Sequence, residues 1–125
     1  MSRRVLIADD SALMRRMVGD TLAADGWEVV AQAATGEEAI AKYAQYRPEV
    51  VTLDIIMPNS EGVDVLRSIL ALDPQAKVVV ISALNQTRLI SEAIRAGAQD
   101  FIAKPFMPER LQETVAACVD ELASV

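Results

Sequence analysis

The stretch Val50-Val51-Thr52-Leu53-Asp54 decides the fold, because it is a run of apolar and β-branched residues that stops on a carboxylate. Such a run is typical of a strand that is covered on both faces of a parallel sheet. Residues 55–62 follow with proline, asparagine, serine and glycine, and this composition predicts a loop. Asp54 is therefore expected where a central strand ends, which is the edge at which open α/β sheets bind ligands.

Strand-like and helix-like segments alternate along the rest of the chain. Apolar runs predict strands over 5–8, 28–33, 50–54, 77–82 and 100–103. Helical spacing of apolar residues predicts one helix between a cap at Asp10 or Ser11 and Gly26, and others over 37–45, 63–72, 86–96 and 108 to about 122. Short connections imply right-handed crossovers. We expect an α/β fold, with a single doubly wound five-stranded parallel sheet and one domain over residues 1–125.

Two local features of the helices are also predicted. Thr35 is expected to cap the second helix, as Ser11 or Asp10 caps the first, because short polar side chains accept backbone hydrogen bonds there. Met14 and Met17 recur on the apolar face of the first helix, and we expect both in the core.

Composition and charge exclude several classes of function. The net charge of −6 argues against a nucleic-acid surface. No apolar run is long enough to span a membrane. Met1-Ser2-Arg3-Arg4 is expected to lead directly into a strand, and we expect no signal peptide. The single cysteine, Cys118, forms no internal disulfide, which fits a cytoplasmic setting. The sequence contains no histidine, which excludes Ser-His-Asp and Cys-His mechanisms and most zinc sites.

Polar residues stand at the C-terminal ends of four predicted strands: Asp9 and Asp10, Asp54, Ser82 and Lys104. In a parallel sheet all of these ends lie at one edge, so neighbouring first and third strands would bring three carboxylates together. Two carboxylates about 4 Å apart repel by about 4 kcal/mol at an effective dielectric constant of about 20. Lys104 offsets part of this charge, and a divalent cation would offset the rest. Oxygen ligands without histidine or cysteine favour Mg²⁺.

A carboxylate, a magnesium ion, a lysine and a hydroxyl around one point indicate phosphoryl transfer. Asp54 would attack phosphorus and form an acyl phosphate. Mg²⁺ and Lys104 would hold the phosphoryl oxygens, and Ser82 would donate a hydrogen bond to one of them. Each residue alone has a structural explanation as a cap, a turn residue or a solvated side chain, but five of them at four strand ends favour a functional site. Arg15 and Arg16 are either a solvated face or part of a kinase-docking surface.

The chain resembles the response-regulator receiver domains over nearly its whole length. The matching segments are residues 5–11, Asp54 with Met57-Pro58 and Gly62, Ser82-Ala83, and 100–106. This resemblance implies the flavodoxin-like fold of CheY, a (βα)5 arrangement with the strand order 2-1-3-4-5.

The resemblance also implies a role for each matching residue. Asp54 is the phosphoacceptor, Lys104 contacts the phosphoryl group, and the Lys104-Pro105 peptide is expected to be cis. Mg²⁺ is bound by Asp9, Asp10, Asp54 and the backbone carbonyl of Ile56. Ser82 and Phe101 form a switch, in which Ser82 moves toward the phosphoryl group and Phe101 turns inward. The output surface is then the fourth helix, fifth strand and fifth helix.

Within the family, the segments 10–16 and 104–106 resemble the chemotaxis regulator CheY and the receiver half of the methylesterase CheB. One departure from the best-known chemotaxis regulators is Phe101, where they carry tyrosine. Phenylalanine can fill the inward pocket but cannot make a hydroxyl hydrogen bond, so the steric half of the switch is expected to survive.

We therefore expect a cytoplasmic two-component response regulator, phosphorylated on Asp54 by a sensor histidine kinase or phosphotransfer protein. Its output would be a protein target such as the flagellar motor switch, and a phosphatase would reset it; no nucleic acid or membrane is expected to bind directly. Self-phosphorylation and autodephosphorylation with Mg²⁺ are expected, but not enzymatic turnover of a substrate.

The alternative is the receiver half of a larger transcription regulator or methylesterase. An aspartyl-phosphate phosphatase is disfavoured, because it would need an acid where Ile56 stands. A flavodoxin-like flavin carrier is set aside, because Asp9 and Asp10 would repel its phosphate.

Overall fold

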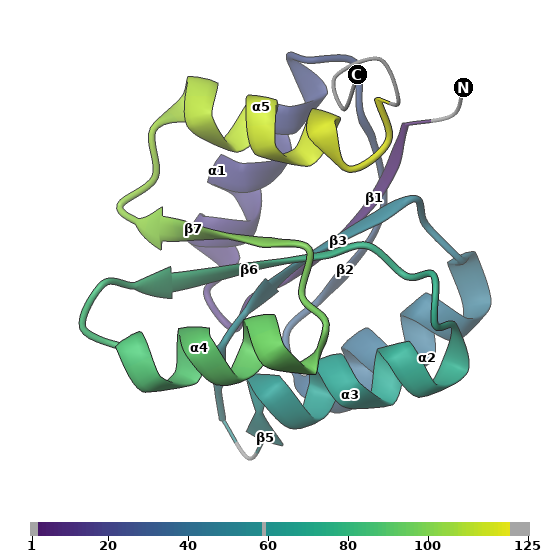
Figure 1. Cartoon of the computed structure of the whole chain (residues 1–125). Coiled ribbons are helices and arrows are strands. Elements are labelled where there is room, and N and C mark those ends of the chain that lie inside the picture. The colour runs from purple at the N-terminus through teal and green to yellow at the C-terminus, as the bar shows by residue number, and fades with distance from the viewer. Residues whose placement is uncertain (1–2, 59, 121–125) are drawn as a thin grey trace.

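A computed structural model describes residues 3–58 and 60–120 and shows one parallel sheet between two layers of helices (Figure 1). The sheet has the order β2-β1-β3-β6-β7, and its five strands are Glu28–Ala33, Arg4–Ala8, Val50–Asp54, Val78–Ala83 and Asp100–Lys104. The helices are α1 Ala12–Ala23, α2 Gly36–Tyr46, α3 Gly62–Leu72, α4 Thr87–Ala96 and α5 Pro108–Ala117. This is the order 2-1-3-4-5 that the family resemblance implied, with β6 and β7 as the fourth and fifth predicted strands.

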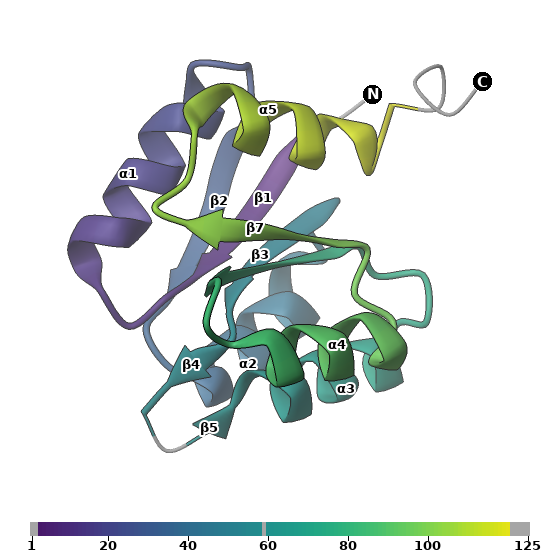
Figure 2. The same cartoon turned by 60° about the vertical axis from the view of Figure 1, so that its left-hand side comes forward.

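The loop predicted over residues 55–62 is wrong in part. Two short antiparallel strands, β4 (Ile56–Met57) and β5 (Ser60–Glu61), form a small hairpin beside the C-terminal edge of the sheet (Figure 2). The first of them shows the alternation of a strand, since Ile56 is exposed and Met57 is buried. Two residues are too few for this alternation to stand out in a sequence that contains Pro58.

Each face of the sheet is covered by its own group of helices. Helices α1 and α5 cover one face, and α2, α3 and α4 cover the other (Figures 1 and 2). The residues of β1 alternate accordingly, with Val5 and Ile7 in the core under α1 and α5, and Leu6 and Ala8 in the other core. All five residues of β3 are buried, as expected for a central strand.

The helix termini follow the predicted caps, whereas the assignment of the methionines was wrong in part. Ser11, and not Asp10, caps α1 by accepting a hydrogen bond from the Met14 N–H, and Thr35 caps α2 by accepting one from the Glu38 N–H. Met17 is 45% exposed, because the buried face of α1 is formed by Val18 and Leu22.

The ends of the chain and the lengths of its helices were also compared with the predictions. Helix α5 ends at Ala117, and Cys118 and Val119 form a turn, so the predicted extension of this helix to about residue 122 is wrong. The predicted absence of a signal peptide concerns Met1 and Ser2, which lie outside the described residues. Over residues 3–58 and 60–120, every helix is too short or too polar to cross a bilayer.

Gly62 fixes the approach of α3 to the end of β3. Its N–H donates to the carbonyl of Ile55 at 2.9 Å, and a Cβ placed on Gly62 would come within 2.5 Å of the Ile55 backbone. A backbone neighbour cannot rotate away as a side chain does, so only glycine permits this contact. The contact holds the segment that directly follows Asp54.

We expect Gly62→Ala to lower the free energy of unfolding by about 1–3 kcal/mol, because the added methyl group displaces the Ile55 backbone. Gly19→Ala, the matched control in α1, would place its Cβ 3.5 Å from the Ile7 side chain, an ordinary contact. It is expected to raise the free energy of unfolding by about 0.5–1 kcal/mol through helix propensity. Urea denaturation of both variants measures this difference, and equal effects of the two substitutions would contradict it.

Candidate functional site

Three carboxylates meet at the C-terminal ends of β1 and β3. These strands are hydrogen-bonded neighbours, with Ala8 opposite Leu53. Each of Asp9, Asp10 and Asp54 offers one carboxylate oxygen, and these three atoms lie within 4.8 Å of one another. Asp9 and Asp54 are buried, with 2% and 7% of their surfaces exposed, whereas Asp10 faces solvent. The cluster predicted from the strand ends is therefore present.

Lys104 reaches the same cluster from the end of β7. Its Nζ lies 3.1 Å from Asp9 Oδ2 and 3.0 Å from Asp54 Oδ2. The Lys104-Pro105 peptide bond is cis, as the family resemblance implied. With one ammonium group and three carboxylates, the side chains of Asp9, Asp10, Asp54 and Lys104 together carry a formal charge of −2.

Burial and charge shift the pKa values of this pair. Burial raises the pKa of Asp54, and the neighbouring Asp9 charge adds to this effect, whereas hydrogen bonds from the Ile56 N–H and Lys104 oppose it. Burial lowers the pKa of Lys104, but its contacts with Asp54 and Asp9 outweigh this, and the net pKa is raised. Lys104 is thus held as a cation, and the excess charge remains on the acids.

The donor set fits a magnesium ion. The three groups that could hold a metal ion are carboxylates, and Mg²⁺ prefers such oxygen ligands while keeping several waters. Solvent-facing Asp10 leaves an open side for those waters. The Ile56 N–H donates to Asp54 Oδ1 at 3.1 Å, which places Ile56 next to the acidic cluster. Coordination by the Ile56 carbonyl stays a prediction.

Ser82 and Phe101 lie on the neighbouring strands β6 and β7. Ser82 is buried, and its hydroxyl donates to the carbonyl of Ala83 at 3.2 Å. Phe101 is half-buried and packs against the core under α2, α3 and α4. It also lines a surface cavity of about 180 Å³ with Leu84, Met107 and other residues of this face. The Ser82 hydroxyl is therefore hydrogen-bonded within its own strand and not to the acidic cluster.

The two arginines of α1, Arg15 and Arg16, differ in exposure and in the contacts that they make. The sequence did not distinguish between them. Arg16 has 81% of its side chain exposed and pairs with Asp20 at 3.8 Å. Arg15 is half-buried and donates to the backbone carbonyl of Asp9 at 2.6 Å and to Gln32 Oε1 at 3.1 Å. Sequence reasoning missed this contact, because helical spacing shows which face a residue occupies but not which loop a long side chain reaches.

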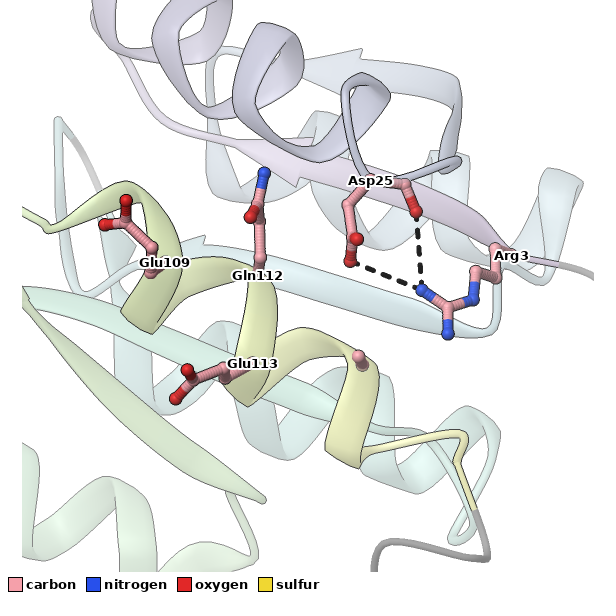
Figure 3. A pocket seen from close by; sticks show the side chains of 6 residues that line it. Arg3, Asp25, Glu109, Gln112 and Glu113 are labelled. Atoms are coloured by element: carbon pink, nitrogen blue, oxygen red, sulfur yellow. Dashed lines mark hydrogen bonds and ion pairs between the residues drawn. The ribbon is translucent and has the colours of Figure 1, made fainter.

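A second pocket, of about 310 Å³, lies beside α5 and the N-terminal end of β1 (Figure 3). Its lining residues include Glu109, Gln112 and the ion pair between Arg3 and Asp25, whose atoms are 3.3 Å apart. None of the lining residues belongs to the acidic cluster, which is built on the C-terminal ends of the strands.

Comparison with known proteins agrees with this geometry. A model of the response regulator receiver domain matches residues 5–116. The chain belongs to the response regulator receiver family.

Relatives of this receiver domain include chemotaxis proteins. It is 47% identical over 115 residues to the chemotaxis protein CheY of Thermotoga maritima, covering 92% of this chain and 96% of that protein. It is 40% identical over 105 residues to a protein-glutamate methylesterase/protein-glutamine glutaminase of a Nocardioides species, covering 82% of this chain and 29% of that protein. A chain in the CheX–CheY–BeF3–Mg²⁺ complex of Borrelia burgdorferi superposes with a TM-score of 0.86 at 34% identity, covering 91% of this chain and 87% of that one. The protein is thus a CheY-like receiver domain of a two-component response regulator.

Proposed function

We propose that Asp54 accepts a phosphoryl group from a phosphohistidine and that the acyl phosphate changes the protein-binding surface of α4, β7 and α5. The observation that carries this proposal is Lys104, held 3.0 Å from the buried carboxylate of Asp54 beside two further acids. Lys104 neutralises only one of the three carboxylate charges, so Asp54 lies beside a fixed cation in a site that still carries negative charge. This site is at the edge of the sheet where open α/β folds bind ligands. The 125 residues contain no histidine, so the phosphohistidine is proposed to belong to a kinase or phosphotransfer partner.

The chemistry assigned to Asp54 is a direct displacement at phosphorus. A carboxylate oxygen forms a bond to phosphorus as the bond to the donor histidine nitrogen breaks, and the electron pair stays on that nitrogen. Asp9, Asp10, Asp54 and the Ile56 carbonyl would hold Mg²⁺, which supplies positive charge to the phosphoryl oxygens when bound. Lys104 holds one of these oxygens as negative charge spreads over them.

The switch assigned to Ser82 and Phe101 starts from the state described above. Once phosphorus is bound to Asp54, the Ser82 hydroxyl would leave the Ala83 carbonyl and donate to a phosphoryl oxygen. Phe101 would then turn into the space that is freed. Phe101, Leu84 and Met107 share one surface cavity, so this movement would reshape the face presented to a target. Phenylalanine limits the readout to shape, because it carries no hydroxyl.

The proposed partners follow from the family and its relatives. A sensor histidine kinase or phosphotransfer protein would phosphorylate the domain, and the output would be a protein target, in a chemotaxis pathway the flagellar motor switch. The Borrelia CheY complex with CheX, BeF3 and Mg²⁺ supports the proposal that this domain binds Mg²⁺ and a partner protein. A phosphatase is proposed to reset the domain. We propose that the domain acts in the cytoplasm and binds neither nucleic acid nor membrane directly.

Two alternatives are weighed against this proposal. The Nocardioides methylesterase match supports a receiver half within a larger regulator, which would use the same phosphoacceptor. An enzyme that turns over an aspartyl phosphate is not supported, because Ile56 cannot protonate a leaving group. We propose self-phosphorylation from small donors and slow autodephosphorylation instead.

Incubation with acetyl phosphate and Mg²⁺ is expected to add the mass of one phosphoryl group to the chain, because Asp54 supplies the nucleophile. Asp54→Ala should abolish this addition. Asp64→Ala is the matched control, since Asp64 lies on α3 with 69% of its side chain exposed. Intact-mass spectrometry measures the product, and equal labelling of the Asp54→Ala protein would refute the mechanism.

The lifetime of the phosphoryl group is expected to depend on Ile56, which follows Asp54 by two residues and is 50% exposed. An apolar side chain cannot orient the attacking water, and Leu84, 67% exposed, cannot either. Ile56→Asn should therefore dephosphorylate faster than the wild type, whereas Ile56→Leu should not. The decay of the phosphorylated form over time measures this, and a decay in Ile56→Asn that is equal or slower would count against the role of Ile56.

A further inference from the structure

Asp9 is held at all of its polar atoms. Its N–H donates to the Ala33 carbonyl at 3.0 Å, and its carboxylate accepts from the Ser11 N–H at 2.9 Å and from Lys104 at 3.1 Å. The remaining polar atom, the backbone carbonyl, accepts from Arg15 Nη1 at 2.6 Å. Arg15 therefore completes the set of contacts that fix this buried acid.

The contact with the carbonyl matters for Asp10 as well. The carbonyl oxygen of Asp9 and the nitrogen of Asp10 belong to one planar peptide unit. Holding that oxygen fixes the plane from which both acidic side chains depart. Among the contacts that the structure describes, no hydrogen bond is made to the Asp10 carboxylate itself, so its position depends on this backbone.

Arg15 is itself held at a second point. Its Nε donates to the side chain of Gln32 on β2 at 3.1 Å, and the backbone carbonyl of Gln32 accepts from Lys42 Nζ on α2. The guanidinium group thus bridges α1 to the C-terminal ends of β1 and β2. A planar group with several fixed donors is suited to such a bridge.

We infer that Arg15 is a positioning residue for Mg²⁺ binding, which fixes the Asp9–Asp10 peptide so that both carboxylates are set for the ion. This inference rests on the proposed function, because it concerns the same metal site. It differs from the two interpretations that the sequence left open for Arg15, a solvated face and a kinase-docking surface.

Electrostatics alone predicts the opposite effect, which makes the inference testable. A guanidinium near the acidic cluster repels Mg²⁺, so removing its charge would tighten binding if charge were its only role. If positioning dominates, Arg15→Met weakens binding although a repelling charge is lost. Arg15→Lys keeps the charge but not the planar fork, so it should weaken binding too.

The experiment is calorimetric titration of Mg²⁺ into the wild type, Arg15→Met, Arg15→Lys and Arg16→Met. We expect both Arg15 variants to bind Mg²⁺ roughly tenfold more weakly, the effect typical of groups that orient metal ligands. Arg16→Met is the matched control and should bind as the wild type does, since Arg16 is exposed and pairs with Asp20. Gln32→Leu should give a smaller loss, with no further loss in the Arg15→Met background.

The outcomes separate this inference from the proposed function. If the wild type itself does not bind Mg²⁺, the proposed metal site fails. If the wild type binds and both Arg15 variants bind as tightly or more tightly, the positioning role is overturned. Urea denaturation identifies a variant that is merely unstable, because a purely structural role lowers the free energy of unfolding and leaves the Mg²⁺ affinity of the folded protein unchanged. Arg15→Lys and Gln32→Leu decide the question if Arg15→Met does not fold.

Discussion

Repulsion among Asp9, Asp10 and Asp54 is the constraint on which the rest of the structure depends. Three carboxylate oxygens within 4.8 Å of one another oppose folding, and Lys104 neutralises one charge of the three. The fold tolerates this cluster because strands β1 and β3 are fixed by cores on both faces of the sheet. The energy that burial supplies elsewhere thus maintains a site that favours binding of a cation and of a phosphoryl group beside it.

Several elements around the acidic cluster hold its residues in position. Gly62 brings α3 against the Ile55 backbone, directly after Asp54. Ser11 caps α1 while its own N–H holds the Asp9 carboxylate. From the other end of the sheet, β7 carries Lys104 to the acids and Phe101 to the surface cavity. The same strand therefore connects the proposed phosphorylation site with the proposed output surface.

Much of this arrangement could be predicted, because parallel strands place their C-terminal ends at one edge. The apolar run before Asp54 predicted a central buried strand, and the polar residues at other strand ends predicted the acidic cluster. The β4–β5 hairpin was missed because two-residue strands leave too short a pattern. The bond from Ser82 to Ala83, the exposure of Met17 and the reach of Arg15 were missed because they depend on side-chain directions in three dimensions, which residue spacing does not encode.

The most direct test of this account compares the melting temperatures of the wild type and Asp10→Asn, each with a chelator and with Mg²⁺. If repulsion among the acids is the central constraint, Asp10→Asn melts at a higher temperature than the wild type in chelator, because one like charge is removed. With Mg²⁺ the wild type gains stability by mass action, and Asp10→Asn gains less. An equal gain in both proteins, or a wild type that is already the more stable in chelator, would contradict the account.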